Sequence, residues 1–138
     1  MTPYSETFQV DFADCDPARI VFYPRYFEWF DRSSERMFRS RGLDWNELWP
    51  AYDLAGLPIV EATAKFLAPS RMGDTITVES WVGEWKGKVF VVEHRVTNAG
   101  QVTVEGREVR VWGLNDPDHP AGMKAASVPD EVIAKMEG

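Results

Sequence analysis

The sequence has a single cysteine, two histidines and no long apolar run. Because Cys15 stands alone, no disulfide can form within the chain, which suits a reducing compartment such as the cytoplasm. Residues 1–6 have neither the basic start nor the apolar stretch of a signal peptide, and no segment has the length and hydropathy of a membrane span. We therefore expect a cytoplasmic protein without a membrane partner.

Basic residues are also few. The 15 Lys and Arg are outnumbered by 22 Asp and Glu, which gives a formal net charge of -7. Binding of nucleic acid needs basic patches that contact phosphates, so this charge argues against a nucleic-acid partner. A polyanionic ligand would need a local basic site that acts against the overall field.

Several catalytic patterns are missing. The chain contains no G-x-S-x-G nucleophile elbow, no G-x-G-x-x-G and no Walker motif. His94 and His119 lack metal-ligand spacing with Cys15 or with acidic residues, so we expect no metal site. Cys15 lies between two aspartates, whose charges should raise the pKa of the thiol and make it a poor nucleophile. We interpret His94, which shares a strand face with Phe90 and Val92, as a packed or rim histidine.

The first half of the chain predicts one strand and one long helix. Its 138 residues suit one domain, residues 1–138, with a hydrophobic core of its own. Apolar and polar residues alternate over 7–12, which predicts a strand. Residues 24–41 predict a helix that begins at Pro24 and ends before Gly42. The stretch that follows, to residue 56, carries Trp and Pro and is predicted to be irregular.

The second half is rich in strand signals. Strands are predicted over 58–67 and 75–84, and two more follow the turns at 86–87 and 98–100. In the last strand, the valines before Gly106 have the opposite phase to those after it, which predicts a bulge or bend at this glycine. Residues 115–126 are predicted to form a loop and residues 128–136 a short helix.

This order of elements is that of an α+β fold. One strand, a long helix and four antiparallel strands can form a single antiparallel sheet of about five strands that holds the helix on one face. The edge strands of such a sheet would be unpaired in a monomer. We therefore expect a homo-oligomer, either a dimer or a tetramer.

The acidic loop that precedes the long helix carries the strongest chemical signal. Asp16 is held in extended geometry by Pro17 and is an anion at neutral pH if it behaves as an ordinary aspartate. It could attack an acyl carbon to give a mixed anhydride, or it could deprotonate a water. Free N–H groups at the helix start could then stabilise the oxyanion. The alternative is that Asp14 and Asp16 only cap a turn or the helix.

Residues 14–24, D-C-D-P-A-R-I-V-F-Y-P, resemble the loop pattern D-x-D-P-A-G-I-V-x-Y-P of the 4-hydroxybenzoyl-CoA thioesterase family of hotdog-fold proteins. Residues 23–31, 57–60 and 73–76 resemble the helix start, strand start and hairpin of the same family. The resemblance implies a hotdog fold and an acyl-CoA thioesterase, which hydrolyses the thioester of an aromatic or a short or medium acyl group. It implies no cofactor, since coenzyme A is part of the substrate.

The resemblance also assigns roles to residues. Asp16 takes the place of the catalytic carboxylate, and the backbone N–H of Tyr23 takes that of the oxyanion donor. Asp31 matches a helix acid that faces the acyl group in the 4-hydroxybenzoyl enzymes. Leu57, followed by Pro58, lies where those enzymes can place a hydroxyl-bearing residue, so the hydroxyl partner for a 4-hydroxybenzoyl group is only half present.

Cationic residues complete the expected site. Lys86 and Lys88 resemble a basic turn that holds the phosphates of coenzyme A, although Gly87 interrupts the run and both lysines could instead be solvated. Arg71 is a further candidate for binding coenzyme A. Arg19 replaces the glycine of the family, where a missing side chain allows close packing or an unusual backbone angle. Its guanidinium could narrow the site, bind a substrate carboxylate or point outward.

Two other functions stay open. A non-catalytic protein that binds acyl-CoA or an aromatic ligand could use the same fold, because a fold does not determine a function. Steady hydrolysis of any acyl-CoA would distinguish it from an enzyme. A hotdog dehydratase would need a histidine paired with an acid, and neither His94 nor His119 lies in a matching motif.

Overall fold

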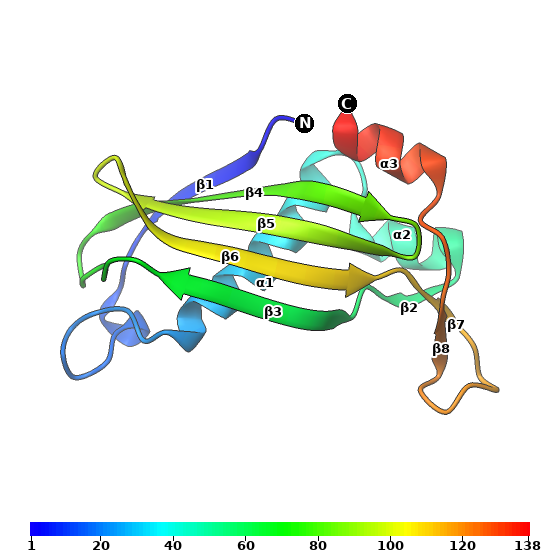
Figure 1. The fold of residues 1–138 in the computed structure, drawn as a ribbon, viewed down its shortest axis with the longest axis horizontal. Helices are drawn as coiled ribbons and strands as arrows, with labels where there is room; N and C mark the ends of the chain where they lie inside the picture. The colour runs from blue at the N-terminus through cyan, green and yellow to red at the C-terminus, as the bar shows by residue number, and fades with distance from the viewer.

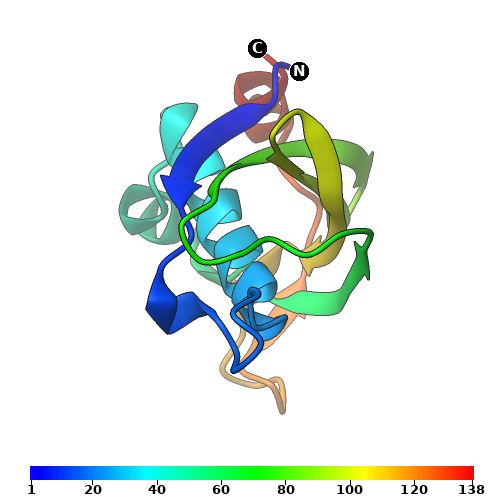
Figure 2. The same ribbon diagram turned by 90° about the vertical axis from the view of Figure 1, so that its left-hand side faces the viewer.

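The computed structural model describes residues 1–138 as a curved antiparallel sheet wrapped around one long helix, α1 (Pro24–Ser40). Figure 1 shows α1 running behind the sheet, and Figure 2 shows the sheet curling around it. The strand order is β1-β4-β5-β6-β3. The bounds of these strands, in chain order, are β1 (Tyr4–Gln9), β3 (Ile59–Phe66), β4 (Thr75–Lys86), β5 (Val89–Asn98) and β6 (Gln101–Val111). The predicted α+β fold, with one long helix on a five-stranded sheet, is confirmed.

Helix α1 packs on the sheet through an apolar stripe with small residues at its centre. Phe30, Met37 and Phe38 are fully buried, as helical spacing of the apolar positions predicts. Ser33 and Ser34 are buried as well, and their short side chains let the helix approach the sheet closely. None of the three helices in the chain has the length and apolar character that a membrane crossing requires.

The predicted bulge at Gly106 is wrong. Gly106 pairs with His94 on β5 and with Ala64 on β3 without a break in register. The extra residue lies earlier in β6, at Thr103, where the register shifts. Glycine at 106 serves packing instead, because a Cβ built there would lie only 2.3 Å from the ring of Phe30.

The inner face of β6 explains the misleading valine pattern. Glu108 and Arg110 face α1 and are buried, at 2% and 3% exposure, whereas Val109 and Val111 lie on the other face of the sheet. A pattern argument assumes that valines point inward and charges outward. Here the reverse holds, because the buried charges have partners on other elements, which are described below.

The segments predicted to be irregular contain secondary structure. Helix α2 (Trp45–Tyr52) begins at Asp44, whose Oδ1 accepts the N–H of Asn46 at 2.9 Å. The short strands β2 (Leu54–Gly56), β7 (Gly113–Asn115) and β8 (Met123–Ala125) form a second sheet of three strands. The predicted terminal helix is confirmed as α3 (Asp130–Glu137).

The first strand also differs from its prediction. It spans Tyr4–Gln9 and ends before a short 3-10 turn at Phe12–Asp14. Phe12, which alternation placed on the inner face, is 79% exposed because the chain has already left the sheet. This turn leads directly into the acidic loop.

Candidate active site

The acidic loop folds into a small hairpin with Asp16 at its turn. Cys15 and Val21 form an antiparallel bridge at its base. The N–H of Asp16 donates to the carbonyl of Ile20 at 3.0 Å, and the N–H of Arg19 donates to the carbonyl of Asp16 at 2.8 Å. The hairpin therefore holds the backbone of Asp16 from both sides.

The two aspartates of the loop have different surroundings. Asp14 Oδ2 accepts the N–H of Asp11 at 3.0 Å and closes the capping box of the 3-10 turn. Asp16 is half-buried, and its Oδ1 accepts the N–H of Ala18 at 2.8 Å, while its Oδ2 has no hydrogen-bond partner within the chain. The capping interpretation thus applies fully to Asp14, and Asp16 keeps one oxygen for other chemistry.

The thiol between these aspartates has the character expected of it. Burial, together with the charges of Asp14 and Asp16, raises the pKa of Cys15. A raised pKa leaves little thiolate at neutral pH, so the thiol is a poor nucleophile. This outcome agrees with the direction predicted from the sequence.

A free backbone donor lies at the start of α1. Tyr23 immediately precedes Pro24, the first residue of this 17-residue helix. The N–H of Arg25 donates to Phe22 and that of Tyr26 donates to Tyr23, whereas the Tyr23 N–H has no partner within the chain. Pro24 has no N–H, so the Tyr23 amide is an available donor at the positive end of the helix dipole.

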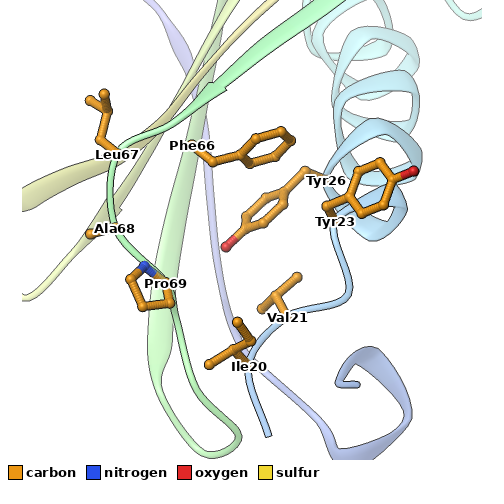
Figure 3. A pocket seen from close by; sticks show the side chains of 8 residues that line it. All are labelled: Ile20, Val21, Tyr23, Tyr26, Phe66, Leu67, Ala68 and Pro69. Carbon is orange, nitrogen blue, oxygen red and sulfur yellow. The ribbon is translucent and has the colours of Figure 1, made fainter. Parts of the chain in front are cut away.

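An apolar cavity of about 340 Å³ opens beside the hairpin (Figure 3). Figure 3 shows Tyr26 and Phe66 directed toward one another, and their ring centroids are 5.7 Å apart. Ile20 and Val21, from the hairpin that carries Asp16, line the cavity below these rings. Burial raises the pKa of the Tyr26 hydroxyl, which is therefore neutral at physiological pH. The sequence analysis assigned no role to Tyr26 or Phe66, although Tyr26 lies within residues 23–31, which carried the resemblance.

The segment before β4 holds the hairpin in place. The N–H of Val21 donates to the carbonyl of Ser70 at 2.9 Å. Asp74 fixes this segment, since its Oδ2 accepts the backbone N–H of Arg71 at 2.8 Å and the side chain of Asn98 at 2.9 Å. These two hydrogen bonds lower the pKa of Asp74. A rigid segment thus supports one side of the Asp16 hairpin.

Arg19 adopts a left-handed backbone, with φ of 64°. Glycine would adopt such an angle without strain, so the backbone here has the unusual angle that was one of the expected reasons for a glycine at this position. The Arg19 side chain is exposed and makes no ion pair within the chain. Arg71, also exposed, is its neighbour, because its backbone forms a bridge with Ile20.

Replacing Arg19 with glycine should raise the free energy of unfolding by about 1 kcal/mol, since a non-glycine residue in the left-handed region is strained. Arg19→Ala is the matched control, because it removes the guanidinium but keeps the strain. Chemical denaturation measures both. If the Arg19 guanidinium binds a substrate carboxylate, both variants lose that contact and kcat/KM should fall equally in the two. A glycine variant that is less stable than the alanine variant would contradict the role of the backbone angle.

The remaining predicted residues lie at the other end of the sheet (Figure 1). Lys86 and Lys88 lie at the turn between β4 and β5, and Lys86 Nζ is 3.5 Å from Glu84. Leu57 and Pro58 precede β3 at this same end. The Leu57 side chain is 4% exposed and belongs to the core, so within one protomer it offers almost no surface to a ligand. One protomer therefore brings Asp16, Arg19, Tyr23 and Arg71 together, but not this second group.

A buried polar network under α1 is the main feature that the sequence analysis missed. His94 Nε2 lies 2.8 Å from Glu108 Oε1, and His94 Nδ1 lies 2.7 Å from the hydroxyl of Ser80. The hydroxyl of Ser34 donates to Glu108 at 2.5 Å. The ring of Phe30 stacks on His94 with centroids 4.6 Å apart, which confirms His94 as a packed histidine.

Glu108 is stabilised in its charged form by its partners in this network. Burial alone would raise the pKa of Glu108, but His94, Arg110 and Ser34 together lower it to about 2. Arg110 Nη2 donates to Glu108 at 3.1 Å and to Asp31 on α1 at 2.7 Å. The predicted residue Asp31 therefore lies where the buried network meets the surface.

Comparison with known proteins gives consistent matches. The family model described as "Thioesterase-like superfamily" matches residues 10–136. The 4-hydroxybenzoyl-CoA thioesterase of Pseudomonas sp. (strain CBS-3) is 34% identical over 131 residues, which are 91% of each chain. The solved structure of that enzyme has a TM-score of 0.88 at 31% identity, over 98% of this chain and 99% of the other. A gentisyl-coenzyme A thioesterase has a TM-score of 0.80 at 32% identity, over 96% of this chain and 99% of the other.

Proposed function

The chain belongs to the thioesterase-like superfamily and is an acyl-CoA thioesterase with a hotdog fold, and we propose that Asp16 and the Tyr23 amide hydrolyse an aromatic acyl-CoA. The products are a free acid and coenzyme A. One observation carries the proposal: a carboxylate oxygen and a backbone N–H, both without partners, belong to one hairpin-to-helix junction beside an apolar cavity.

Asp16 can act in either of two ways. As a nucleophile, its carboxylate oxygen attacks the thioester carbon and the coenzyme A thiolate leaves, after which water hydrolyses the mixed anhydride. As a general base, it takes a proton from a water whose oxygen attacks the same carbon, and the coenzyme A thiolate then leaves as the C–S bond breaks. In both routes negative charge develops on the thioester oxygen, and the Tyr23 N–H at the helix start donates to it.

The aromatic lining of the cavity supports an aromatic acyl group. Tyr23, Tyr26 and Phe66 contribute rings to the wall of the cavity, and aromatic rings pack favourably against one another at centroid distances of about 4.5–7 Å. The two relatives above are named for 4-hydroxybenzoyl-CoA and gentisyl-CoA, both aromatic thioesters. Coenzyme A takes part only as a portion of the substrate, and the free Cys15 suits a reducing compartment such as the cytoplasm.

A panel of thioesters tests this proposal. Release of free thiol is measured with 4-hydroxybenzoyl-, gentisyl-, benzoyl-, hexanoyl- and palmitoyl-CoA, and the highest kcat/KM is expected for the aromatic esters. Tight binding of these esters without turnover would instead support the non-catalytic binding protein. Preference for the aliphatic esters would contradict the aromatic assignment and leave the hydrolase intact.

The structure offers one observation that bears on the dehydratase alternative. His94 does pair with an acid, Glu108, as such an enzyme would need. The side chains of His94 and Glu108 are only 0% and 3% exposed, so neither can contact a substrate. The pair is structural, and hydrolysis is the better-supported activity.

The exposed edge of β3 supports a homodimer. This strand pairs only with β6, so its other edge is free. Ile59, Val60 and Phe66 are large apolar residues on this strand and are 40%, 63% and 49% exposed. Antiparallel pairing of two β3 strands about a two-fold axis would extend the sheet and cover them. It would also bring the Pro58 end of one protomer to the Phe66 end of the other, near Asp16. The two groups of predicted residues would then form one site.

Val60→Lys should dissociate the dimer, because a lysine on each of two paired edges places like charges together. Light scattering should give twice 15.7 kDa for the wild type and 15.7 kDa for the variant. The monomeric variant should also hydrolyse the thioester more slowly than the dimeric wild type. Gln101→Lys, an exposed change at the first residue of β6, is the control and should stay dimeric. An active wild-type monomer would contradict the shared site, and a mass of four chains would support a tetramer.

Lys86 and Lys88 are proposed to bind the phosphates of coenzyme A across the dimer. Changing both to alanine should raise KM roughly tenfold at low salt and leave kcat nearly unchanged, because phosphate contacts act equally in the ground and transition states. The difference should shrink as salt rises. Lys135→Ala on α3 is the control. An unchanged KM at low salt would assign the phosphates elsewhere, with Arg71 as the next candidate.

A further inference from the structure

One buried guanidinium, that of Arg110, connects three separate elements of the fold. Its Nη2 donates to Asp31 Oδ1 on α1 at 2.7 Å. Its Nη1 donates to the carbonyl of Leu57, just before β3, at 3.0 Å. Its Nη2 also donates to Glu108 Oε2 on its own strand at 3.1 Å, and its Cζ lies 5.7 Å from the centre of the Trp45 ring. Each of these contacts restricts the position of the guanidinium.

The pair between Arg110 and Asp31 differs from an ordinary surface ion pair. The Asp31 side chain is 62% exposed, but that of Arg110 is only 4% exposed. Surface ion pairs are weak because both side chains lose freedom when they associate. Here the cation is already fixed by Glu108, which in turn is held by His94 and Ser34. The Arg110 side chain therefore loses little conformational entropy when it pairs with Asp31.

This arrangement gives Asp31 a fixed orientation at the surface. Its Oδ1 is bound to Arg110, and its Oδ2 has no partner within the chain. An ionised carboxylate with one oxygen free is an acceptor for a hydroxyl group. The same guanidinium holds the Leu57 carbonyl, so the position of Asp31 is tied to the segment that leads into β3.

We propose that Arg110 is a positioning residue for the acyl group, because it orients Asp31 as an acceptor for a ring hydroxyl and fixes it relative to residues 57–58. This inference rests on the proposed hydrolysis of aromatic acyl-CoA. Arg110 itself is buried and contacts no substrate. Its effect is on selectivity between aromatic esters with and without a hydroxyl.

Arg110→Lys is the principal test. Lysine keeps the buried positive charge, but it lacks the planar fork that can bind three acceptors at once. The ratio of kcat/KM for 4-hydroxybenzoyl-CoA to that for benzoyl-CoA is expected to fall about tenfold, because a hydroxyl acceptor that is displaced no longer discriminates. Arg107→Lys is the matched control on the same strand, since Arg107 forms only a half-exposed ion pair with Glu93. It should leave the ratio unchanged.

A double-mutant cycle separates positioning from stability. Asp31→Asn should reduce the ratio about as much as Arg110→Lys, and the double variant should be no worse than either one. If Arg110→Lys does not fold, Arg110→Met with Glu108→Gln removes both buried charges together and should show the same loss of selectivity. A folded variant that keeps the wild-type ratio overturns the inference, and so does an equal loss of kcat/KM for both esters. A wild type that hydrolyses neither ester would instead refute the proposed function.

Discussion

Asp16→Asn is expected to lower kcat roughly 10²-fold or more, which is the contribution of one positioned acid–base or nucleophilic group. The fold should stay intact. Asparagine has the shape of aspartate, and its oxygen can still accept the N–H of Ala18 that Oδ1 accepts in the wild type. Only the negative charge is lost. Binding of the thioester should therefore survive, and the measurement is kcat and KM with the best aromatic ester together with a thermal unfolding curve.

Asp14→Asn is the matched control for this prediction. Its carboxylate already accepts the N–H of Asp11 within the capping box, so it has a structural role and its loss should change kcat little. Near wild-type turnover by Asp16→Asn would refute the assignment of the reacting carboxylate. An equal loss in both variants would indicate that the loop needs both charges for its shape.

Glu108→Gln is expected to reduce the free energy of unfolding by about 3 kcal/mol at pH 7. The folded-state pKa of Glu108 is about 2, below its ordinary value of 4.5. A lowered pKa means that the ionised group stabilises the fold above pH 4.5, and that this contribution is lost as the pH falls from 4.5 toward 2. The difference between wild type and variant should therefore shrink over this range. Urea unfolding at a series of pH values measures it.

Glu105→Gln provides the comparison for the buried carboxylate. Glu105 lies on the same strand but is exposed, and it makes no ion pair within the chain. Its substitution should change the free energy of unfolding by less than about 0.5 kcal/mol. A difference for Glu108→Gln that stays constant down to pH 2 would show that the charge of Glu108 is not what stabilises the network.

Features set by neighbouring residues could be predicted from the sequence. The long helix was located because Pro24 suits its first position and Gly42 follows its end, where the backbone has φ of +76°. The Asp16 loop was located because Pro17 restricts the residue before it. In both cases the physical cause lies within a few residues of its effect.

Features set by distant partners could not be predicted. The inward orientation of Glu108 and Arg110 depends on His94, Ser34 and Asp31, which are 14 to 79 residues away in the sequence. No local pattern distinguishes a strand with paired buried charges from one with exposed charges. Motifs in the sequence predicted both the group of site residues around Asp16 and the group around Lys86. The distance between these two groups within one protomer depends on the whole sheet, so no motif could predict it.

The contact between Gly106 and Phe30 fixes the tilt of α1, and with it the position of the Tyr23 amide that we propose as the oxyanion donor. The Phe30 ring packs directly on the backbone of the sheet at Gly106, and the hydroxyls of Ser33 and Ser34 hydrogen-bond to the sheet beside it. These contacts fix the middle of α1, so a tilt of the helix would pivot about this point. The Tyr23 amide lies just before the first helical residue, roughly 15 Å from Ser33 at 1.5 Å per residue. A rotation of α1 by about 5° about this point would move the amide by about 1 Å, enough to cost a hydrogen bond and on the order of 10²-fold in rate. A side chain at position 106 would press on Phe30 from the sheet and tilt α1, and the displaced Tyr23 amide would then slow the proposed hydrolysis.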